Sequence, residues 1–276
     1  MENGIKLHSK LIAVNGPPSS GKTTLALKLA QEVHERTKKR VIYLSPDTMI
    51  PALGLIFPKR EKGSLLSLGK ALENVNLSNS DILGVILTTK SMENMGYLGY
   101  VPGEGPHTYA ELGEDKVREL FRLLKENYDY IFVDCDRNRE ELISSIACGL
   151  SDHLIQIINP DIRSVAYYGF EEIRENSMQV LTLLDNNIFL PIQDIKARFP
   201  KIQHTILYSK AVKMQMLEGE LMDPLKDPVY RKGIKPIVDV LMAEPEPEAP
   251  AQTEEEGSEA AAADPLAAAQ DDVFKE

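Results

Sequence analysis

The chain has 276 residues, of which 43% are hydrophobic, and its formal net charge is −11. This length and apolar content suit one large α/β domain or two small ones. Residues 244–276 hold eleven acidic residues and one basic residue, so they carry −10 and residues 1–243 carry about −1. Residues 1–243 therefore lack the positive net charge with which proteins bind DNA phosphates, which argues against DNA binding. A local basic patch is an open alternative.

Cysteine content and targeting signals bear on the compartment. The two cysteines, Cys135 and Cys148, do not form a C-x-x-C pair, and the histidines lack metal-ligand spacing. The N-terminal residues lack the apolar core of a signal peptide, and no apolar run approaches the length of a membrane span. We therefore expect a cytoplasmic protein with reduced thiols and no direct membrane insertion.

The first predicted elements flank a glycine-rich loop. Residues 11–14 are apolar and predict a short buried strand, and an apolar stripe from Leu25 to Val33 predicts a helix. Between them, residues 16–23 match the phosphate-binding pattern G-x-x-x-x-G-K-[ST] at every defined position. Strand, loop and helix in this order favour a nucleotide site over an ordinary turn with incidental glycines.

The residue types of this loop suit phosphate binding. Gly16 and Gly21 permit turn conformations that a side chain would obstruct. The backbone N–H groups then face the anion at the positive end of the helix dipole. Lys22 is expected to reach the β- and γ-phosphates, and the Thr23 hydroxyl to ligate magnesium. The predicted nucleotide-binding residues of the loop are Gly16, Ser19, Ser20, Gly21, Lys22, Thr23 and Thr24.

Strands and helices alternate along the rest of residues 1–243. Apolar runs predict strands at residues 41–44, 82–88, 128–134, 153–158, 180–184 and 204–207. Helical patterns cover residues 63–72, 114–126, 140–150, 192–199, 212–220 and 236–242, and a further helix begins at residue 163. Glycine and proline predict connections at residues 48–60 and a long loop at residues 91–106. The alternation predicts an α/β fold with a mostly parallel sheet and helices on both faces.

Residues 244–276 differ from the rest in composition. They are rich in Ala, Glu and Pro and lack apolar periodicity, which is typical of a disordered segment. The sequence therefore predicts one domain over residues 1–243 and an acidic, disordered tail over residues 244–276.

Polar residues follow several of the predicted strands, where open parallel sheets bind their ligands. Asp134 ends an apolar strand, a position typical of a carboxylate that holds magnesium, and we prefer this role to that of a solvated aspartate. Asp47 either positions water or magnesium or belongs to an ordinary Ser-Pro-Asp turn. Asp136 shares the function of Asp134 or lies beyond it, and Asn159 follows a further strand.

Several segments together resemble one family. GPPSSGKTTLALKLA is similar to the loops of RecA-type proteins and small-molecule kinases. Residues 128–168 resemble the MinD/ParA group of ATPases, which pairs a Y-D-hydrophobic-D strand with a helix, a further strand and x-P-[DE]-x-x-S-V. TILYSKAVKMQMLEGE is similar to a later segment of the same group. The resemblance covers residues 8–240 and, within the group, extends to the CpaE/TadZ branch linked to pilus secretion systems.

The resemblance implies a MinD/ParA-like P-loop NTPase fold, ATP and Mg²⁺ as cofactors, a nucleotide-dependent homodimer and a protein partner in a larger assembly. Lys22, Asp47 and Asp134 match catalytic positions, with Asp47 as the switch I aspartate and Asp134 as the Walker B or switch II aspartate. Thr23 and Asp134 match the magnesium-binding positions. Either Asn186 or Asn187 matches the asparagine that reads adenine.

Two departures from the family pattern bear on turnover. Pro17 stands where the family has an additional lysine, and Ser45 stands where it has the first acid of a D-x-D pair. We therefore expect a slowly hydrolysing ATPase that acts as a positioning or assembly switch. The alternatives are a small-molecule phosphotransferase, for which Arg137 and Arg139 supply an arginine pair, a RecA-like ATPase, and a scaffold that binds nucleotide without turnover.

Overall fold

The computed structural model describes residues 9–60, 63–105, 107–138, 140–188 and 190–244. The predicted tail, apart from Glu244, and Arg139 lie outside the described residues. The strands are β1 (Lys10–Asn15), β2 (Val41–Ser45), β3 (Leu87–Thr89), β4 (Met92–Gly99), β5 (Tyr130–Asp134), β6 (His153–Ile158), β7 (Met178–Thr182) and β8 (Ile202–Ile206). The helices are α1 (Lys22–Thr37), α2 (Ala52–Ile56), α3 (Leu68–Leu72), α4 (Asn79–Val85), α5 (Glu114–Asn127), α6 (Leu142–Leu150), α7 (Ile162–Phe170), α8 (Ile192–Arg198), α9 (Lys210–Glu218) and α10 (Pro228–Met242).

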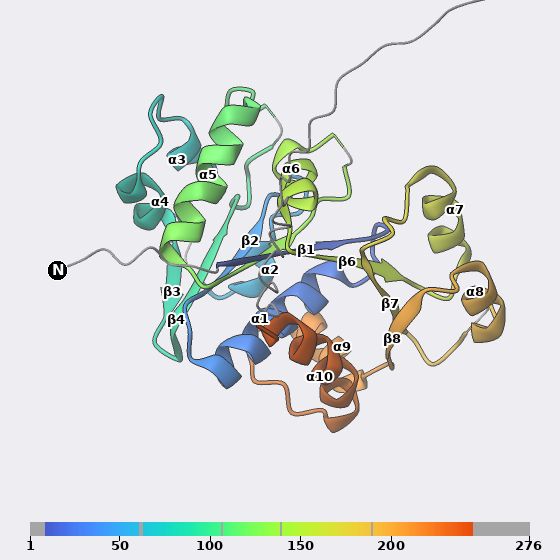
Figure 1. Ribbon diagram of the computed structural model, residues 1–276. Coiled ribbons are helices and arrows are strands. Elements are labelled where there is room, and N and C mark those ends of the chain that lie inside the picture. Colours follow the sequence, from blue (N-terminus) through green and yellow to red (C-terminus); the bar gives the residue numbers. More distant parts are fainter. Residues whose placement is uncertain (1–8, 61–62, 106, 139, 189, 245–276) are drawn as a thin grey trace, which may run out of the picture. The chain divides into compact units, whose positions relative to one another are not determined.

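The strands form one sheet in the order β3-β4-β2-β5-β1-β6-β7-β8 (Figure 1). Every neighbouring pair is parallel except β3 and β4, which are antiparallel. β1 pairs with β5 on one side and β6 on the other, so the glycine-rich loop leaves the middle of the sheet. The predicted α/β fold with a mostly parallel sheet is confirmed.

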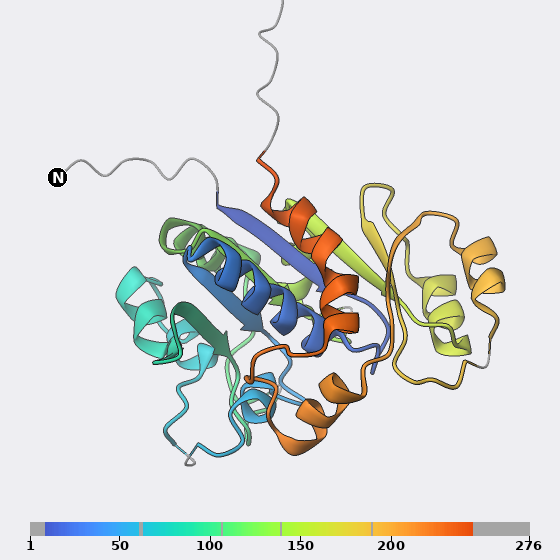
Figure 2. The same ribbon diagram turned by 90° about the horizontal axis from the view of Figure 1, so that it is seen from below.

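Both faces of the sheet are covered by helices. Ile12 and Val14 of β1 point to the face where α1 packs beside α10 (Figure 2). Leu11 and Ala13 point to the opposite face, where they join a core built from α3, α4, α5 and α6. A smaller cluster at the β7 end of the sheet packs α7 and α8. The near-continuous apolar strands of the sequence follow from this burial on two faces.

Two predictions between residues 82 and 106 are wrong. The strand predicted at residues 82–88 is helical over most of its length: Ser78 and Asp81 make a reciprocal cap that starts α4, and α4 runs to Val85. Only Leu87 and Thr88 of this range belong to a strand, the short β3. The predicted loop at residues 91–106 contains β4, which pairs with β2 inside the sheet. Its glycines are needed for close packing, because a Cβ atom on Gly99 would lie 2.6 Å from the Ser45 carbonyl oxygen.

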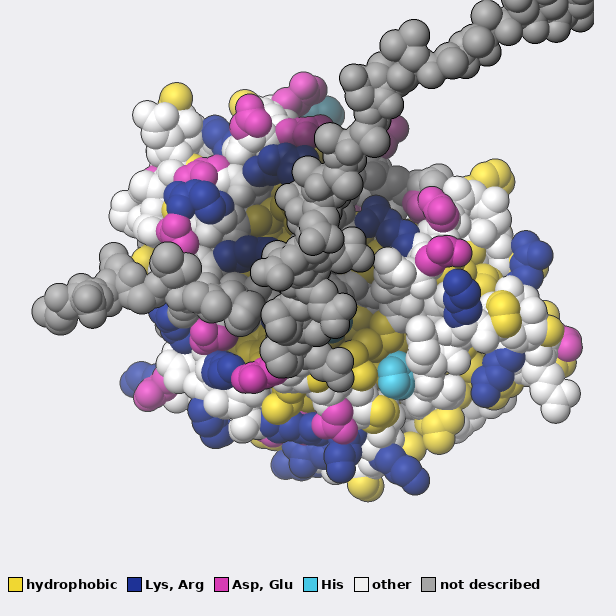
Figure 3. Space-filling view, viewed as in Figure 1, with side chains coloured by type: hydrophobic (Ala, Val, Ile, Leu, Met, Phe, Trp, Pro, Cys, Tyr) yellow, Lys and Arg dark blue, Asp and Glu magenta, His cyan; other side chains and the backbone are white. Residues whose placement is uncertain are grey.

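The distribution of charged side chains on the surface is relevant to the partners that the protein can bind. On the face shown in Figure 3, Lys and Arg side chains are interspersed with Asp and Glu side chains over most of the described surface. This pattern matches the near-neutral charge of residues 1–243. No helix in the described part of the chain is long and apolar enough to cross a bilayer.

Candidate functional site

The glycine-rich loop connects β1 to α1 at the carboxyl edge of the sheet. Gly21 has φ +88°, a left-handed conformation that favours glycine, and Ser19 is also left-handed with φ 60°. Gly16 is needed for space, because a Cβ atom there would lie 3.0 Å from Ile157 Cβ and 3.1 Å from its carbonyl oxygen. The loop therefore folds tightly against β6.

The N-terminus of α1 presents its backbone N–H groups at the end of this loop. α1 begins at Lys22, and no side chain among the described residues caps it at Gly21. Uncapped N–H groups at the positive end of a helix dipole form a site for an anion. Thr24 lies partly buried in the same first turn, and Ser19 is exposed at the loop surface.

Lys22 lies folded back over the loop that precedes it. Its Nζ donates to the carbonyl oxygens of Gly16 at 3.0 Å and Pro17 at 3.1 Å. Burial lowers the pKa of Lys22, and the nearby Asp134 carboxylate opposes this shift. The amine is therefore held in the loop by neutral oxygens, which a phosphate could replace as partners.

Asp134 ends β5 and lies directly against α1. The Thr23 hydroxyl donates to Asp134 Oδ2 at 2.7 Å, and the Tyr43 hydroxyl of β2 donates to the same oxygen at 2.8 Å. Burial raises the pKa of the Asp134 carboxyl, and the bond from Thr23 is the largest opposing contribution. Burial also raises the pKa of Tyr43 well above its usual value, so its hydroxyl is a neutral donor.

This cluster fits a magnesium ion. Asp134 Oδ1 is buried and has no hydrogen-bond partner within the described ranges of the chain. A buried carboxylate oxygen without a partner is costly unless a cation or a water fills the position. Oxygen ligands from a hydroxyl and a carboxylate, together with water and phosphate, are the donor set that magnesium takes. Thr23 and Asp134 are therefore the residues that would hold it.

Asp47 is held in a turn after β2. Its Oδ1 accepts the backbone N–H groups of Met49 at 2.7 Å and Ile50 at 2.8 Å, as in ordinary aspartate turns. Its Oδ2 pairs with the Arg137 guanidinium at 3.2 Å. The turn geometry is present, and the two hydrogen bonds and the ion pair together fix the carboxylate at the rim of the site.

Asn159 follows β6 and ties the loop to the sheet. Its Nδ2 donates to the carbonyl oxygens of Ser20 at 3.3 Å and Thr182 at 2.9 Å. The Ser20 hydroxyl is buried and has no hydrogen-bond partner among the residues the structure describes. Asn159 is thus a structural support of the loop, and the predicted nucleotide-binding role of Ser20 stays a prediction.

Asn186 and Asn187 lie in the exposed segment after β7. Leu184 in this segment approaches the phosphate loop, because a Cβ atom on Gly21 would lie 3.0 Å from Leu184 Cδ2. The Asn187 N–H donates to Asp185 Oδ1 at 3.2 Å. The segment therefore runs beside the loop, and the predicted adenine-reading role of either asparagine stays a prediction.

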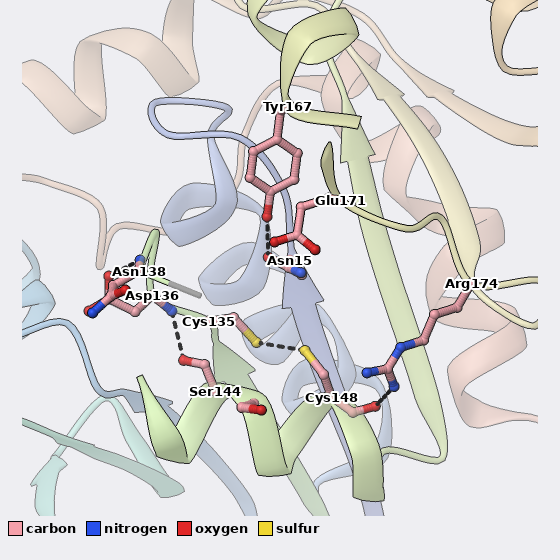
Figure 4. Close-up of a pocket in the computed structure, with 10 residues that line it drawn as sticks. Asn15, Cys135, Asp136, Asn138, Ser144, Cys148, Tyr167, Glu171 and Arg174 are labelled. Atoms are coloured by element: carbon pink, nitrogen blue, oxygen red, sulfur yellow. Dashed lines mark hydrogen bonds between the residues drawn. The ribbon is translucent and has the colours of Figure 1, made fainter. Parts of the chain in front are cut away.

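A polar pocket of about 220 Å³ is lined by Cys135 and Asp136, the two residues that follow Asp134 in the chain (Figure 4). Asp136 borders it, and its N–H donates to Ser144 Oγ at 2.8 Å. Tyr167 of α7 donates to Asn15 Oδ1 at 3.3 Å across it. The lining residues are Asn15, Cys135, Asp136, Asn138, Ser144, Ser145, Cys148, Tyr167, Glu171 and Arg174. Asp136 thus borders this pocket and also opposes the lowering of the Lys22 pKa, so a function shared with Asp134 stays a prediction.

Tyr43 is the residue of this site that the sequence reasoning missed. It lies in the middle of an apolar strand, where a tyrosine reads as a core residue. A buried tyrosine hydroxyl needs a hydrogen-bond partner, so its presence in a strand beside the predicted site was the available signal.

Comparisons with known proteins give structural matches. No protein-family profile and no curated protein sequence matches the chain. A ParA family ATPase from Chlorobium tepidum matches at TM-score 0.66 with 15% identity, over 83% of this chain and 99% of that one. MinD in a MinC:MinD complex from Aquifex aeolicus matches at TM-score 0.63 with 18% identity, over 87% and 98%. MinD with Mg-ADP from Pyrococcus horikoshii matches at TM-score 0.62 with 18% identity, over 85% and 96%. This chain has the fold of the MinD/ParA P-loop ATPases.

Proposed function

We propose that the protein is an ATP-binding, Mg²⁺-dependent, slowly hydrolysing ATPase that acts as a nucleotide-dependent positioning or assembly switch. The observation that carries the proposal is the 2.7 Å hydrogen bond from Thr23 to Asp134. It joins the last residue of the phosphate-loop motif to the end of a strand 111 residues later. These are the two protein groups that hold magnesium in P-loop nucleotide hydrolases.

The residues of the site have different roles in phosphoryl transfer. The N–H groups at the start of α1 and the Lys22 amine bind the phosphates, so Lys22 exchanges its two carbonyl partners for phosphate oxygens. Thr23 and Asp134 would hold magnesium, which would neutralise part of the charge of the phosphates. Asp47 orients the attacking water from the rim of the site, where its backbone bonds hold it.

Slow hydrolysis follows from missing charge. Pro17 contributes neither a cation nor a backbone N–H, and Ser45 contributes no carboxylate. Ser45 is buried at the end of β2, and its neutral hydroxyl cannot supply the negative charge of an acid there. An additional cation at the transition state of phosphoryl transfer contributes about three to five powers of ten in rate. We infer that an arginine or lysine from a partner restores it.

The proposed switch also includes association of the protein with other chains. We propose a homodimer that forms with bound nucleotide, and a protein partner in a larger assembly. A structural neighbour, MinD of Aquifex aeolicus, was solved in complex with MinC. Because Pro17 lacks the family's lysine, the dimer of this chain is held by contacts other than that lysine across the nucleotide.

Phosphate release tests the proposal against the alternatives. The purified full chain with Mg-ATP and no acceptor should release phosphate slowly, and Asp47→Ala should lower the rate further. Lys90→Ala, at an exposed site between β3 and β4, is the matched control and should leave the rate unchanged. Phosphate release only after a small-molecule acceptor is added would favour a phosphotransferase. Fast turnover that Asp47→Ala does not change would show that the catalytic machinery is assigned wrongly.

A further inference from the structure

Tyr43 is a core residue that reaches the candidate magnesium carboxylate. Its side chain is 0% exposed on β2, and its hydroxyl donates to Asp134 Oδ2 at 2.8 Å. Thr23 donates to the same oxygen, while Asp134 Oδ1 has no partner within the described part of the chain. Two donors on one oxygen therefore fix the orientation of the carboxylate and leave the other oxygen available.

We propose that Tyr43 is a positioning residue for magnesium, an inference that rests on the function proposed above. The Thr23 hydroxyl can rotate and has two lone pairs, so it can turn toward a cation when nucleotide binds. Tyr43 then remains as the hydroxyl donor on Asp134 Oδ2, and it keeps Oδ1 directed toward the metal. Supporting groups of this kind orient the ligands of a metal and tune its affinity.

The sheet offers a matched control for this role. Tyr97 of β4 is the register partner of Tyr43, is equally buried and belongs to the same hydrophobic cluster. Its hydroxyl lies 3.5 Å from Met92 Sδ, a weak acceptor. Phe132, the register partner of Tyr43 on β5, shows that a phenylalanine ring packs in this layer. Tyr43→Phe and Tyr97→Phe therefore remove the same group from the same core.

The experiment is a magnesium titration of the full-length protein at fixed ATP, read as the ATP-induced shift in melting temperature. Tyr43→Phe should raise the magnesium concentration needed for half of the shift by about tenfold, because one hydrogen bond to a charged group is lost. Tyr97→Phe should behave as the wild type. In EDTA all three proteins should give the same ATP-induced shift, since the effect acts through the metal.

The outcomes separate this inference from the proposed function. An equal magnesium requirement in all three proteins, or equal losses in both variants, would overturn the positioning role while the proposed function stands. A wild-type protein whose ATP-induced shift ignores magnesium would overturn the proposed function and this inference with it.

A second inference concerns Cys135 and Cys148, the only cysteines of the chain. Their sulfur atoms lie 3.6 Å apart, one directly after β5 and the other on α6 (Figure 4). Both residues line the polar pocket of about 220 Å³, where Cys135 is buried and Cys148 is partly exposed, so a small molecule can reach the Cys148 sulfur. The hydrogen bond with Cys135 lowers the pKa of Cys148, which makes Cys148 the more reactive thiol.

We infer that the pair is a modification site at which a small hydroperoxide forms an intramolecular disulfide. The Cys148 thiolate attacks the peroxide O–O bond, which gives a sulfenic acid and releases an alcohol or water. The Cys135 sulfur then attacks the sulfenic sulfur, and the hydroxyl leaves as water. Two thiols are oxidised and one peroxide is reduced. The sulfur atoms must approach from 3.6 Å to about 2.05 Å, and the bond would tie the end of β5 to α6.

Intact-mass analysis and thiol counting test this assignment after treatment of the full chain with hydrogen peroxide. The expected product is a monomer that has lost two hydrogen atoms and has no thiol that can be alkylated. Reduction with dithiothreitol should restore both thiols. Cys148→Ser should give no such product, and the wild-type disulfide should raise the melting temperature because the link restricts the unfolded chain. Two thiols that persist under peroxide, or chains linked to one another through cysteine, would overturn the inference.

Discussion

At the scale of single residues, buried polar groups carry most of the candidate site. Thr23, Tyr43 and Asp134 come from three elements and share one carboxylate oxygen. The loop motif predicted Thr23, and the strand-end position predicted Asp134. A tyrosine in the apolar pattern of β2 signals a buried hydroxyl that needs a partner, but the pattern does not identify Asp134 as the group that accepts its hydrogen bond. The structure also shows Asp47 in a turn with Arg137, a pairing over 90 residues that spacing alone cannot indicate.

A buried lysine away from the site gives a pH prediction. Lys28 of α1 donates to the carbonyl oxygens of Leu221 at 2.7 Å and Asp223 at 2.9 Å. Burial lowers the pKa of Lys28 from 10.5 to about 8. Between these two values the unfolded chain holds a proton that the folded chain has lost, so raising the pH favours folding.

The prediction compares the wild type with Lys28→Met by urea unfolding at several pH values. The free energy of unfolding of the wild type should rise relative to the variant between pH 8 and pH 10.5, with a slope of at most about 1.4 kcal/mol per pH unit. Below pH 8 the difference should be constant. Parallel pH profiles for the two proteins would show that the Lys28 amine is not desolvated.

At the scale of elements, periodicity predicted most of the fold. The amphipathic pattern of α5 and the apolar runs of β1, β2, β5 and β6 each match the observed elements, because burial imposes the pattern. β4 was predicted as a loop because Gly96 and Gly99 read as turn residues. These glycines are required by packing between elements, because a Cβ atom on Gly96 would lie 2.8 Å from Ile86 Cγ2. A sequence pattern does not show which neighbouring atom in the fold leaves no room for a side chain at these glycines.

The packing of β4 predicts the effect of a single methyl group. Gly99→Ala places Cβ 2.6 Å from a backbone oxygen of β2, which cannot move without disturbing the sheet. It should lower the free energy of unfolding by about 1–3 kcal/mol, the usual cost of overpacking. Gly84→Ala on α4 meets no atom within 4 Å and should be stabilising by about 0.5–1 kcal/mol. Chemical denaturation measures both, and equal effects would contradict the steric account.

At the scale of the whole molecule, the charge is divided between the fold and the acidic segment at residues 244–276. We propose that this segment buries no core, since its composition lacks apolar periodicity. Deleting residues 245–276 should therefore change the melting temperature by less than about 2 °C, well below the shift of a core substitution. Differential scanning calorimetry of the two proteins checks this. A large loss of stability in the shortened protein would show that the segment packs on the fold.

Nucleotide binding through the phosphate loop is the claim on which the rest depends. Its most direct test is the melting temperature with and without Mg-ATP, because a ligand that binds only the native state stabilises it by mass action. At ATP concentrations of about 100 times Kd, the wild type should gain about 2.7 kcal/mol. Lys90→Ala should gain the same, and Lys22→Ala should gain nothing. An ATP-induced shift that persists unchanged in Lys22→Ala would contradict the account.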